Sequence, residues 1–255
     1  MDEYIRFECV DFRFEAKGRY NNLVLKGLEL SISKGEFHVL LGPSGCGKTT
    51  ALNLVAGFEF PSGGQVRVNG QVVTRPGVDR VVIFQGDDSL YRWLTALENV
   101  EFGLRVAGVS AADRRREALQ HLRLVGLEGQ EDKFPSQLSG GMKQRVQLAR
   151  ALACHTDILL MDEPFGALDA QTRSGLQAEL SELWQRTGST VLFVTHDIAE
   201  AILLADRISV MTGGPEAGIR QTVVNSLPRP RSIASLEFGE MYQCVNRLLA
   251  PDVEM

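Results

Sequence analysis

The stretch GPSGCGKTT, from Gly42 to Thr50, constrains the fold of this chain more than any other part of the sequence. It places three glycines and a proline between an apolar run, FHVLL, and a segment with the composition of a helix. Glycine costs conformational entropy and buries almost no apolar surface, so core packing does not explain it here. The spacing fits G-x-x-x-x-G-K-[ST], in which backbone N–H groups and a helix N-terminus surround phosphate oxygens. The sequence therefore predicts a strand, a nucleotide-phosphate loop and a helix in that order.

The residues of this loop have expected roles. Lys48 is predicted to reach the β- and γ-phosphates and to assist catalysis, and the hydroxyl of Thr49 is predicted to bind Mg²⁺. An ordinary glycine-rich turn with an exposed lysine is the alternative, but the flanking strand and helix argue against it. The predicted nucleotide-binding residues of the loop are Gly42, Pro43, Ser44, Gly45, Cys46, Gly47, Lys48, Thr49 and Thr50.

Four short apolar runs end in residues that can do chemistry. FHVLLG leads into the loop, RVVIFQ ends at Gln85, DILLMDE ends at Asp162 and Glu163, and TVLFVTH ends at His196. Continuous apolar runs are typical of strands buried on both faces of a parallel sheet. Ligands bind beyond the carboxyl ends of such strands, so these side chains are expected to converge on one crevice of an α/β fold. Asp162 is suited to hold Mg²⁺, and Glu163 is suited to act as general base toward water.

The remaining segments have other patterns. Residues 4–35 and 64–74 alternate in polarity, and an Asn-Gly pair at Asn69 predicts a hairpin, so a small antiparallel sheet is expected there. From Thr95 to Ala153 the pattern is helical, with Ser110 as a predicted cap. The chain after Gly213 is expected to be a looser tail with an amphipathic end.

Composition excludes several classes of function. A net charge of −5 and a pI near 5.5 give no electrostatic reason to expect nucleic acid as a partner. The four cysteines lie far apart without a CxxC pair, which argues for a reducing compartment and against structural zinc. The N-terminus MDEYIRFECV lacks the apolar core of a signal peptide, and no apolar run reaches the roughly 18 residues of a membrane helix. We expect a soluble chain whose membrane role comes through a partner.

The octapeptide LSGGMKQR, from Leu138 to Arg145, is the most informative stretch. Ser139, Gly140 and Gly141 precede a helical run, which predicts a second anion-binding helix N-terminus, this time without a lysine. For the SGG tripeptide alone, an ordinary serine cap with flexible glycines would be the simpler interpretation. The position of the octapeptide shortly before the strand that ends in Asp162 favours the functional interpretation.

With these motifs in this order, the chain resembles the ATP-binding subunits of ABC transporters over about residues 5–215. The matches are Walker A (Gly42–Thr49), the Q-loop (Gln85), the signature motif (Leu138–Gln144), Walker B (Asp162, Glu163), the D-loop (Gly166–Asp169) and the H-switch (His196). The resemblance implies a P-loop NTPase (RecA-like) core with a small N-terminal antiparallel β-subdomain and an inserted α-helical signature subdomain. The expected bounds within a single domain of residues 1–255 are 1–94 with 154–215 for the core and β-subdomain, 95–153 for the helices and 216–255 for a short tail.

The resemblance also implies roles for the site residues. Two chains would form a head-to-tail homodimer around two ATP molecules, with Ser139, Gly140 and Gly141 of one chain at the γ-phosphate bound by the other. Gln85 would sense Mg²⁺ and the attacking water, His196 would contact the γ-phosphate, and Asp169 would lie at the shared nucleotide site.

The adenine platform is an aromatic residue near the N-terminus in this family. Phe14 aligns best with that position, but the following segment EAKGRYNN looks like an insertion, so Tyr20 is the alternative. Packing within the N-terminal sheet is the other interpretation of either ring.

Within the family, RVVIFQGDDSLYRWL and FGALDAQTR are similar to importer subunits for taurine, aliphatic sulfonates and nitrate. Those subunits commonly have a proline before the tryptophan, whereas Arg92 precedes Trp93 here, which puts the docking loop in doubt. The implied partners are an integral-membrane permease and, indirectly, an extracytoplasmic solute-binding protein, at the cytoplasmic face of the plasma membrane. The substrate does not contact such a subunit, so these residues do not identify it.

Two other functions share the same motifs. An exporter or lipid-handling ATPase would use the same chemistry with another partner, and a non-transport ABC protein would act as a mechanical switch. The latter usually carries two cassettes or a long coiled coil, and a neighbouring permease gene would decide between the alternatives.

The stretch after Gln85 contains Leu90, Tyr91, Trp93 and Leu94 close together. The resemblance places it where a cytoplasmic helix of the permease docks, which predicts exposed apolar side chains. The alternative is that these side chains belong to the core.

Overall fold

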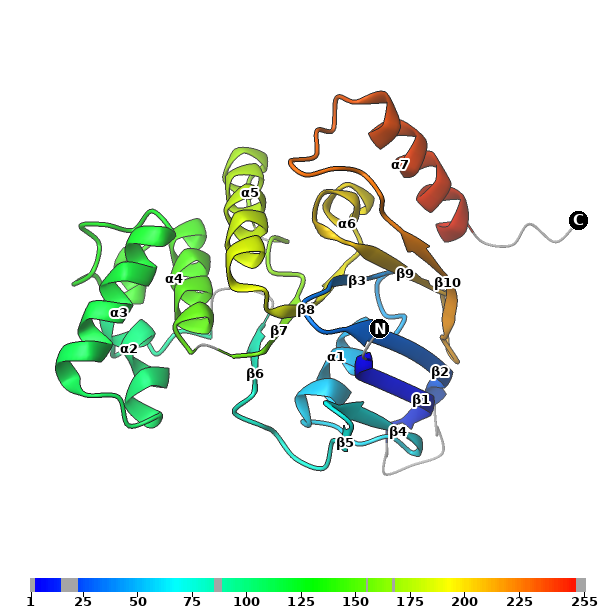
Figure 1. Cartoon of the computed structure of the whole chain (residues 1–255), viewed down its shortest axis with the longest axis horizontal. Helices are drawn as coiled ribbons and strands as arrows, with labels where there is room; N and C mark the ends of the chain where they lie inside the picture. Colours follow the sequence, from blue (N-terminus) through cyan, green and yellow to red (C-terminus); the bar gives the residue numbers. More distant parts are fainter. Residues whose placement is uncertain (1–2, 15–22, 85–88, 155, 167, 251–255) are drawn as a thin grey trace, which may run out of the picture. The chain divides into compact units, whose positions relative to one another are not determined.

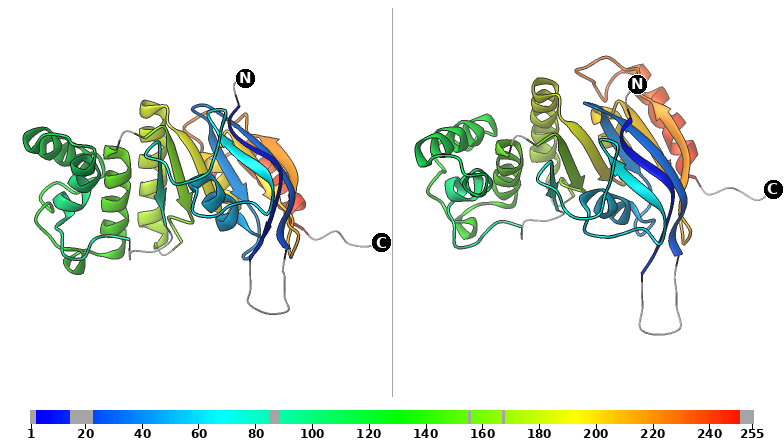
Figure 2. Two further views of the ribbon diagram at one scale, coloured as in Figure 1. Left: turned by 90° about the horizontal axis from the view of Figure 1, so that it is seen from below. Right: turned by 60° about the horizontal axis from the view of Figure 1, so that its bottom comes forward.

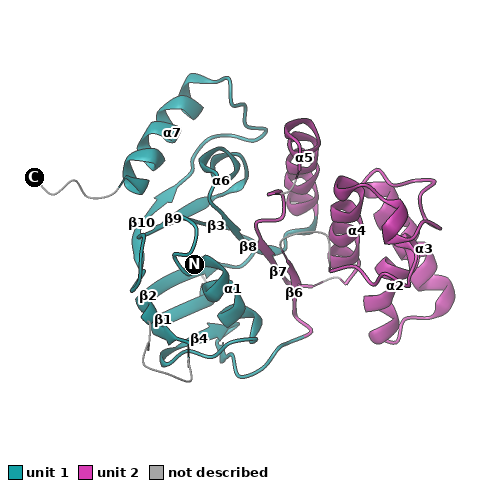
Figure 3. Cartoon of the chain, turned by 180° about the vertical axis from the view of Figure 1, so that it is seen from behind, with its two compact units in different colours: residues 1–77, 187–255 teal, residues 78–186 magenta. Residues whose placement is uncertain are grey.

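The computed structural model describes residues 3–14, 23–84, 89–154, 156–166 and 168–250 of the 255-residue chain. Two residues singled out above, Tyr20 and Gln85, lie outside these ranges. The chain divides into two compact units, unit 1 with residues 1–77 and 187–255 and unit 2 with residues 78–186 (Figure 3).

Unit 1 contains the predicted antiparallel sheet, with strand order β2-β1-β4-β5 (Figure 1). Its strands are β1 (Glu3–Arg13), β2 (Leu23–Ser33), β4 (Gly63–Val68) and β5 (Gln71–Val72). Asn69 and Gly70 connect β4 to β5 with φ values of 49° and 73°. Two successive positive φ values suit the tight turn of a hairpin, and the Asn-Gly prediction is confirmed.

The second set of strands in unit 1 is mainly parallel. It runs β10-β9-β3-β8, with β3 parallel to both of its neighbours and β10 antiparallel to β9. The strands are β3 (Phe37–Leu41), β8 (Thr190–Thr195), β9 (Arg207–Met211) and β10 (Ile219–Val224). Every residue of β3 and β8 is buried, which explains their mainly apolar sequences.

Three helices cover these strands. α1 (Lys48–Ala56) packs against both β8 and β4, so it lies between the two sheets of unit 1 (Figure 2). α6 (Ile198–Leu204) packs on β3 and β8, and α7 (Leu236–Leu249) packs on β9, β10 and α6. The tail after Gly213 is therefore more ordered than its sequence indicated, because it supplies β10 and α7.

Unit 2 pairs β6 (Arg80–Ile83) in parallel with β7 (Ile158–Asp162). Its helices are α2 (Ala96–Val106), α3 (Ala111–Leu124), the short 3-10 helix η1 (Pro135–Gln137), α4 (Gly140–Ala153) and α5 (Ala170–Thr187), whose last residue falls in unit 1. α2, α3 and α4 pack on one another, and Ser110 caps α3 as predicted. The expected helical insertion of residues 95–153 lies within unit 2, which also holds β6, β7 and most of α5.

Candidate nucleotide-binding site

The predicted phosphate loop follows β3 and leads directly into α1. Lys48 is buried, and its Nζ donates hydrogen bonds of 2.9 Å to the backbone carbonyls of both Gly42 and Pro43. These bonds hold the ammonium group against the loop. A cation fixed in this position is preorganised for a phosphate that enters the loop.

The glycines of the loop are required by its geometry. Gly47 has a φ of 93°, and a Cβ atom there would lie 2.7 Å from Cδ2 of Leu25. A Cβ atom on Gly42 would lie 2.8 Å from Sγ of Cys46. Gly47 is also the N-cap of α1 and makes no side-chain cap bond, and the first turn has no acidic residue. The backbone N–H groups of this turn therefore suit an anion.

His196 follows β8 at the same edge of the sheet as the phosphate loop. Leu41 and Thr195 are partners in the parallel β3–β8 ladder, so the residues that follow each strand leave the sheet side by side. The side chain of His196 is exposed. Within unit 1, the structure thus brings together two of the predicted site elements that lie about 150 positions apart in the sequence.

Phe14 follows β1, and its ring is 53% exposed. It packs at nearly a right angle to the ring of buried Phe12, with the ring centroids 4.9 Å apart. Phe12 pairs with Leu25, and Leu25 lies directly beneath Gly47, so this end of β1 is on the side of the phosphate loop. A half-exposed aromatic ring held by a second ring suits stacking on a base.

We expect Phe14→Ala to raise the dissociation constant for ATP by about tenfold, because stacking of a base on an aromatic ring contributes about 1–3 kcal/mol. Tyr20→Ala, in the insertion, is the matched variant and should leave the affinity within twofold. Both are measured by calorimetric titration of ATP. Weaker binding in Tyr20→Ala alone would show that the alignment across the insertion is wrong.

In unit 2, the paired carboxylates lie at the end of β7. Asp162 is buried, and Glu163 is partly exposed with a φ of 44°, which is unusual for a residue other than glycine. Strained backbone of this kind is frequent at functional sites. The amide Nε2 of Gln144, on α4, donates to the backbone carbonyl of Pro164 and so ties the signature helix to the turn after Glu163. Gln85 would follow β6, the parallel neighbour of β7, but lies outside the described residues.

The signature residues form the N-terminus of α4. Ser139 caps this helix by accepting a 3.3 Å bond from the backbone N–H of Met142, which leaves its hydroxyl proton available to a ligand. Nothing lies within 4 Å of a Cβ atom built on Gly140, whereas one on Gly141 would lie 2.8 Å from Cγ2 of Thr172. Gly141 is therefore needed for close packing against α5.

The D-loop residue Asp169 borders the signature residues. Its Oδ1 accepts bonds from the N–H groups of Gln171 and Thr172 at the start of α5, and these bonds hold the pKa of its carboxyl below the usual range. Both motifs line an open groove of about 740 Å³ in unit 2. Its lining residues include Ser139, Gly140, Gly141, Leu168, Asp169 and Thr172.

The sequence interpretation missed the contact of Gln144 with Pro164. A signal was present, because Gln144 is four residues before Leu148 and shares its apolar face of α4, where a buried amide needs a partner. The partner itself is a backbone carbonyl, which no side-chain pattern identifies.

The fold and these residues define a P-loop nucleotide-binding protein: a parallel strand, a glycine loop with a buried lysine, and a helix N-terminus open to phosphate. Residues 25–166, more than half of the chain, match the family model described as ABC transporter. The chain belongs to the ABC transporter family, as an ATP-binding cassette with ATPase chemistry.

Similar proteins from other organisms support the assignment to the ABC transporter family. The chain is 49% identical over 218 residues to the bicarbonate transport ATP-binding protein CmpD of Synechocystis, covering 85% of this chain and 76% of that protein. It is 45% identical over 245 residues to the taurine import ATP-binding protein TauB of Pseudomonas aeruginosa, covering 93% and 92%. Among solved structures, it resembles a dimeric ATP-binding cassette in a post-hydrolysis state with bound ADP and Pi, with a TM-score of 0.76, 32% identity and coverage of 89% and 99%.

Proposed function

We propose that this chain is the ATP-hydrolysing subunit of an importer for a small anionic solute, working as a head-to-tail homodimer around two ATP molecules. The observation that supports the proposal is a pair of helix N-termini with different surroundings, each suited to an anion. α1 has a buried lysine in its loop, and α4 offers Ser139 and an open Gly140 without a cation. The second is suited to complete the nucleotide site of a partner copy.

Within each nucleotide site, hydrolysis is assigned to the residues at the strand ends. Lys48 and the N–H groups of α1 bind the phosphates, and Glu163 accepts a proton from the attacking water. His196 contacts the γ-phosphate, and Gln85 helps to position the water and the metal. The signature residues Ser139 to Gly141 and the D-loop Asp169 act on the nucleotide held by the other chain.

Mg²⁺ is the metal that these residues fit. Asp162 offers one carboxylate at the end of β7, and Thr49, an exposed residue, offers a hydroxyl at the start of α1. Magnesium is usually held in nucleotide sites by one or two such oxygen ligands together with phosphates and water. In the described part of the chain, no group of three or more His, Cys, Asp or Glu side chains could hold a metal by itself. When bound, Mg²⁺ neutralises charge on the phosphates.

The proposals for the transported solute and for the partners rest on the names of similar proteins. Taurine and bicarbonate, named for two of them, are small solutes that carry an anionic group, and nitrate and sulfonates share this property. Among the described residues, no helix is long and apolar enough to cross a bilayer. We infer that a separate permease carries the solute, that an extracytoplasmic binding protein delivers it, and that this chain works at the cytoplasmic face of the plasma membrane.

The stretch after Gln85 that is predicted to dock on the permease has one of its apolar residues in the core and another on the surface. Leu90 is 4% exposed, so the expectation that it lies on the surface is wrong, whereas Trp93 is 73% exposed. The reason is the buried side chain of Asn99, which bonds to both the N–H and the carbonyl of Tyr91 and folds the stretch back onto α2. Trp93 remains the candidate contact for the permease.

We expect Trp93→Asp to leave the isolated cassette folded and able to bind ATP, while copurification with the permease and solute uptake fall at least tenfold. Large aromatic residues dominate the binding energy of most interfaces. Val106→Asp, at a residue that is 72% exposed on α2, is the matched control and should keep both activities. Leu90→Asp should instead unfold unit 2, because it places a carboxylate in the core. Uptake by Trp93→Asp at the wild-type rate would remove Trp93 from the interface.

A further inference from the structure

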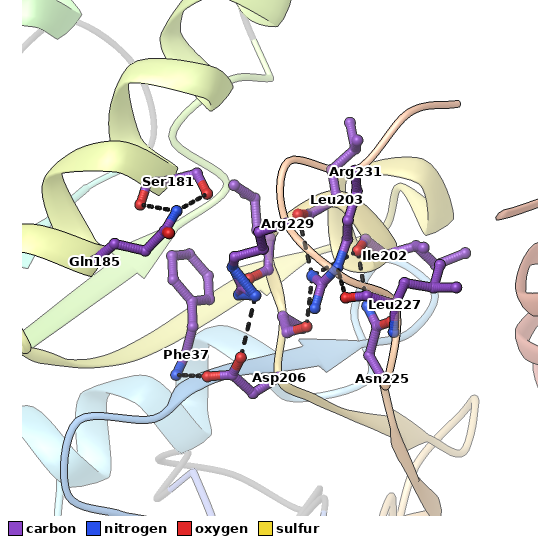
Figure 4. Close-up of polar contacts among 12 residues, drawn as sticks. Phe37, Ser181, Gln185, Ile202, Leu203, Asp206, Asn225, Leu227, Arg229 and Arg231 are labelled. Carbon is purple, nitrogen blue, oxygen red and sulfur yellow. Dashed lines mark hydrogen bonds and ion pairs between the residues drawn. The ribbon is translucent and has the colours of Figure 1, made fainter. Parts of the chain in front are cut away.

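The segment from residue 225 to residue 231, with the sequence NSLPRPR, leaves β10 and passes over the C-terminal end of α6 (Figure 4). We call it the strap. The guanidinium of Arg231 donates from Nη1 to the carbonyls of Ile202 at 2.9 Å, Leu203 at 3.1 Å and Ala205 at 2.8 Å. Its Nε donates to the carbonyl of Leu227 at 3.0 Å.

These contacts satisfy the end of a helix. The last carbonyls of an α-helix have no partners within the helix and carry the negative end of its dipole, so a cation stabilises them. Burial, with a further contribution from nearby Arg229, lowers the pKa of Arg231 to about 10. Buried Asn225 adds a 2.8 Å bond from Nδ2 to the carbonyl of Ile202. Arg229 donates from Nη2 to the carbonyl of Leu204, so three side chains of the strap hold the last turn of α6.

The other end of α6 carries the turn that contains His196. The Oδ1 of Asp197 accepts from the N–H groups of Ala199 at 2.7 Å and Glu200 at 3.2 Å. The hydroxyl of Thr195 donates to buried Glu200 at 2.7 Å and accepts from the N–H of Asp197 at 3.0 Å. Both neighbours of His196 are thus bonded to the first turn of α6.

α6 has only seven residues, so it is about 10 Å long and forms two turns. In a helix of two turns the N–H groups of the second turn bond to the carbonyls of the first, so we expect α6 to move as one body. A displacement of its C-terminal turn is therefore passed to the turn that bears His196.

We propose that Arg231 is a positioning residue for His196: the strap fixes α6, and α6 fixes the turn that bears His196 at the edge of the sheet where the phosphate loop begins. The inference rests on the role proposed above for His196 in hydrolysis. It gives the C-terminal segment a part in catalysis from the opposite end of α6 to the turn that bears His196.

The test uses steady-state hydrolysis of Mg-ATP by the full chain. Arg231→Gln should lower kcat by about 10- to 100-fold, as expected for misplacement of a reacting group, with the dissociation constant for ATP within twofold of wild type. Arg231→Lys, which keeps a cation and three donors, should recover part of kcat. If Arg231→Gln does not fold, the kcat of Arg231→Lys is compared with that of the wild type instead. Hydrogen exchange should show loss of protection in the segment from Thr195 to Glu200.

The matched control is Arg220→Gln. Arg220 caps the end of α7 through the carbonyls of Leu248 at 2.9 Å and Ala250 at 2.7 Å, so its loss removes the same kind of contact from another helix. This variant should keep kcat and the exchange pattern of residues 195–200.

A double-mutant comparison separates the inference from the proposed function. If Arg231 acts through His196, adding Arg231→Gln to His196→Ala should lower kcat by less than twofold further. Effects that multiply would overturn the positioning role while leaving His196 in the mechanism. Full activity in His196→Ala would overturn the proposed role of His196, and the inference with it.

Discussion

Glu163→Gln is expected to bind Mg-ATP with nearly normal affinity and to hydrolyse it about 10²–10⁴-fold more slowly than the wild-type chain, which is the usual contribution of a general base. The amide has the size of the carboxylate but cannot take a proton from water at neutral pH. An ATP-bound dimer should therefore accumulate, and gel filtration with and without ATP would detect it beside the measurement of kcat.

The matched control is Asp157→Asn, an exposed carboxylate just before the opposite end of β7. It removes the same charge without approaching Glu163, and its kcat should be unchanged. Turnover of Glu163→Gln within threefold of wild type, in a folded protein, would contradict the assignment of the base.

Lys48→Ala is expected to raise the dissociation constant for ATP by about 10- to 100-fold, since a hydrogen bond to a charged group contributes about 1.5–3 kcal/mol. The variant removes both the charge and the bonds that Nζ makes to Gly42 and Pro43, so the loop also loses its preorganised shape. Calorimetric titration with ATP measures the change.

Lys26→Ala is the control for charge alone. Lys26 is an exposed lysine of β2 that pairs with Glu216 at 2.7 Å, and its loss should leave ATP affinity within twofold. Unchanged affinity in Lys48→Ala would contradict the assignment of the phosphate loop.

Local patterns in the sequence were sufficient for much of the fold. The apolar runs before Gly42, Asp162 and His196 proved to be the buried strands β3, β7 and β8, because strands covered on both faces consist mainly of apolar residues. The Asn-Gly turn and the cap at Ser110 were also predicted, since each depends on a few adjacent residues.

The prediction for Leu90 failed because exposure is not a local property. Leu90 and Trp93 are large apolar residues three positions apart, but only Leu90 is buried in the core. The difference arises from Asn99, nine residues after Leu90, whose amide bonds to Tyr91 set the direction of the chain. A polar residue within an apolar helix face indicates a buried contact without indicating which group accepts it.

The sequence by itself determined the phosphate loop, the strands and the class of chemistry, because these depend on residue types at fixed short spacings. The tertiary structure alone decided the left-handed backbone of Glu163, the bond from Gln144 to Pro164 and the capping of α6 by Arg231. The last two contacts join side chains to backbone carbonyls 20 and 29 positions away. Every residue carries such a carbonyl, so only the folded chain selects the one that is within reach.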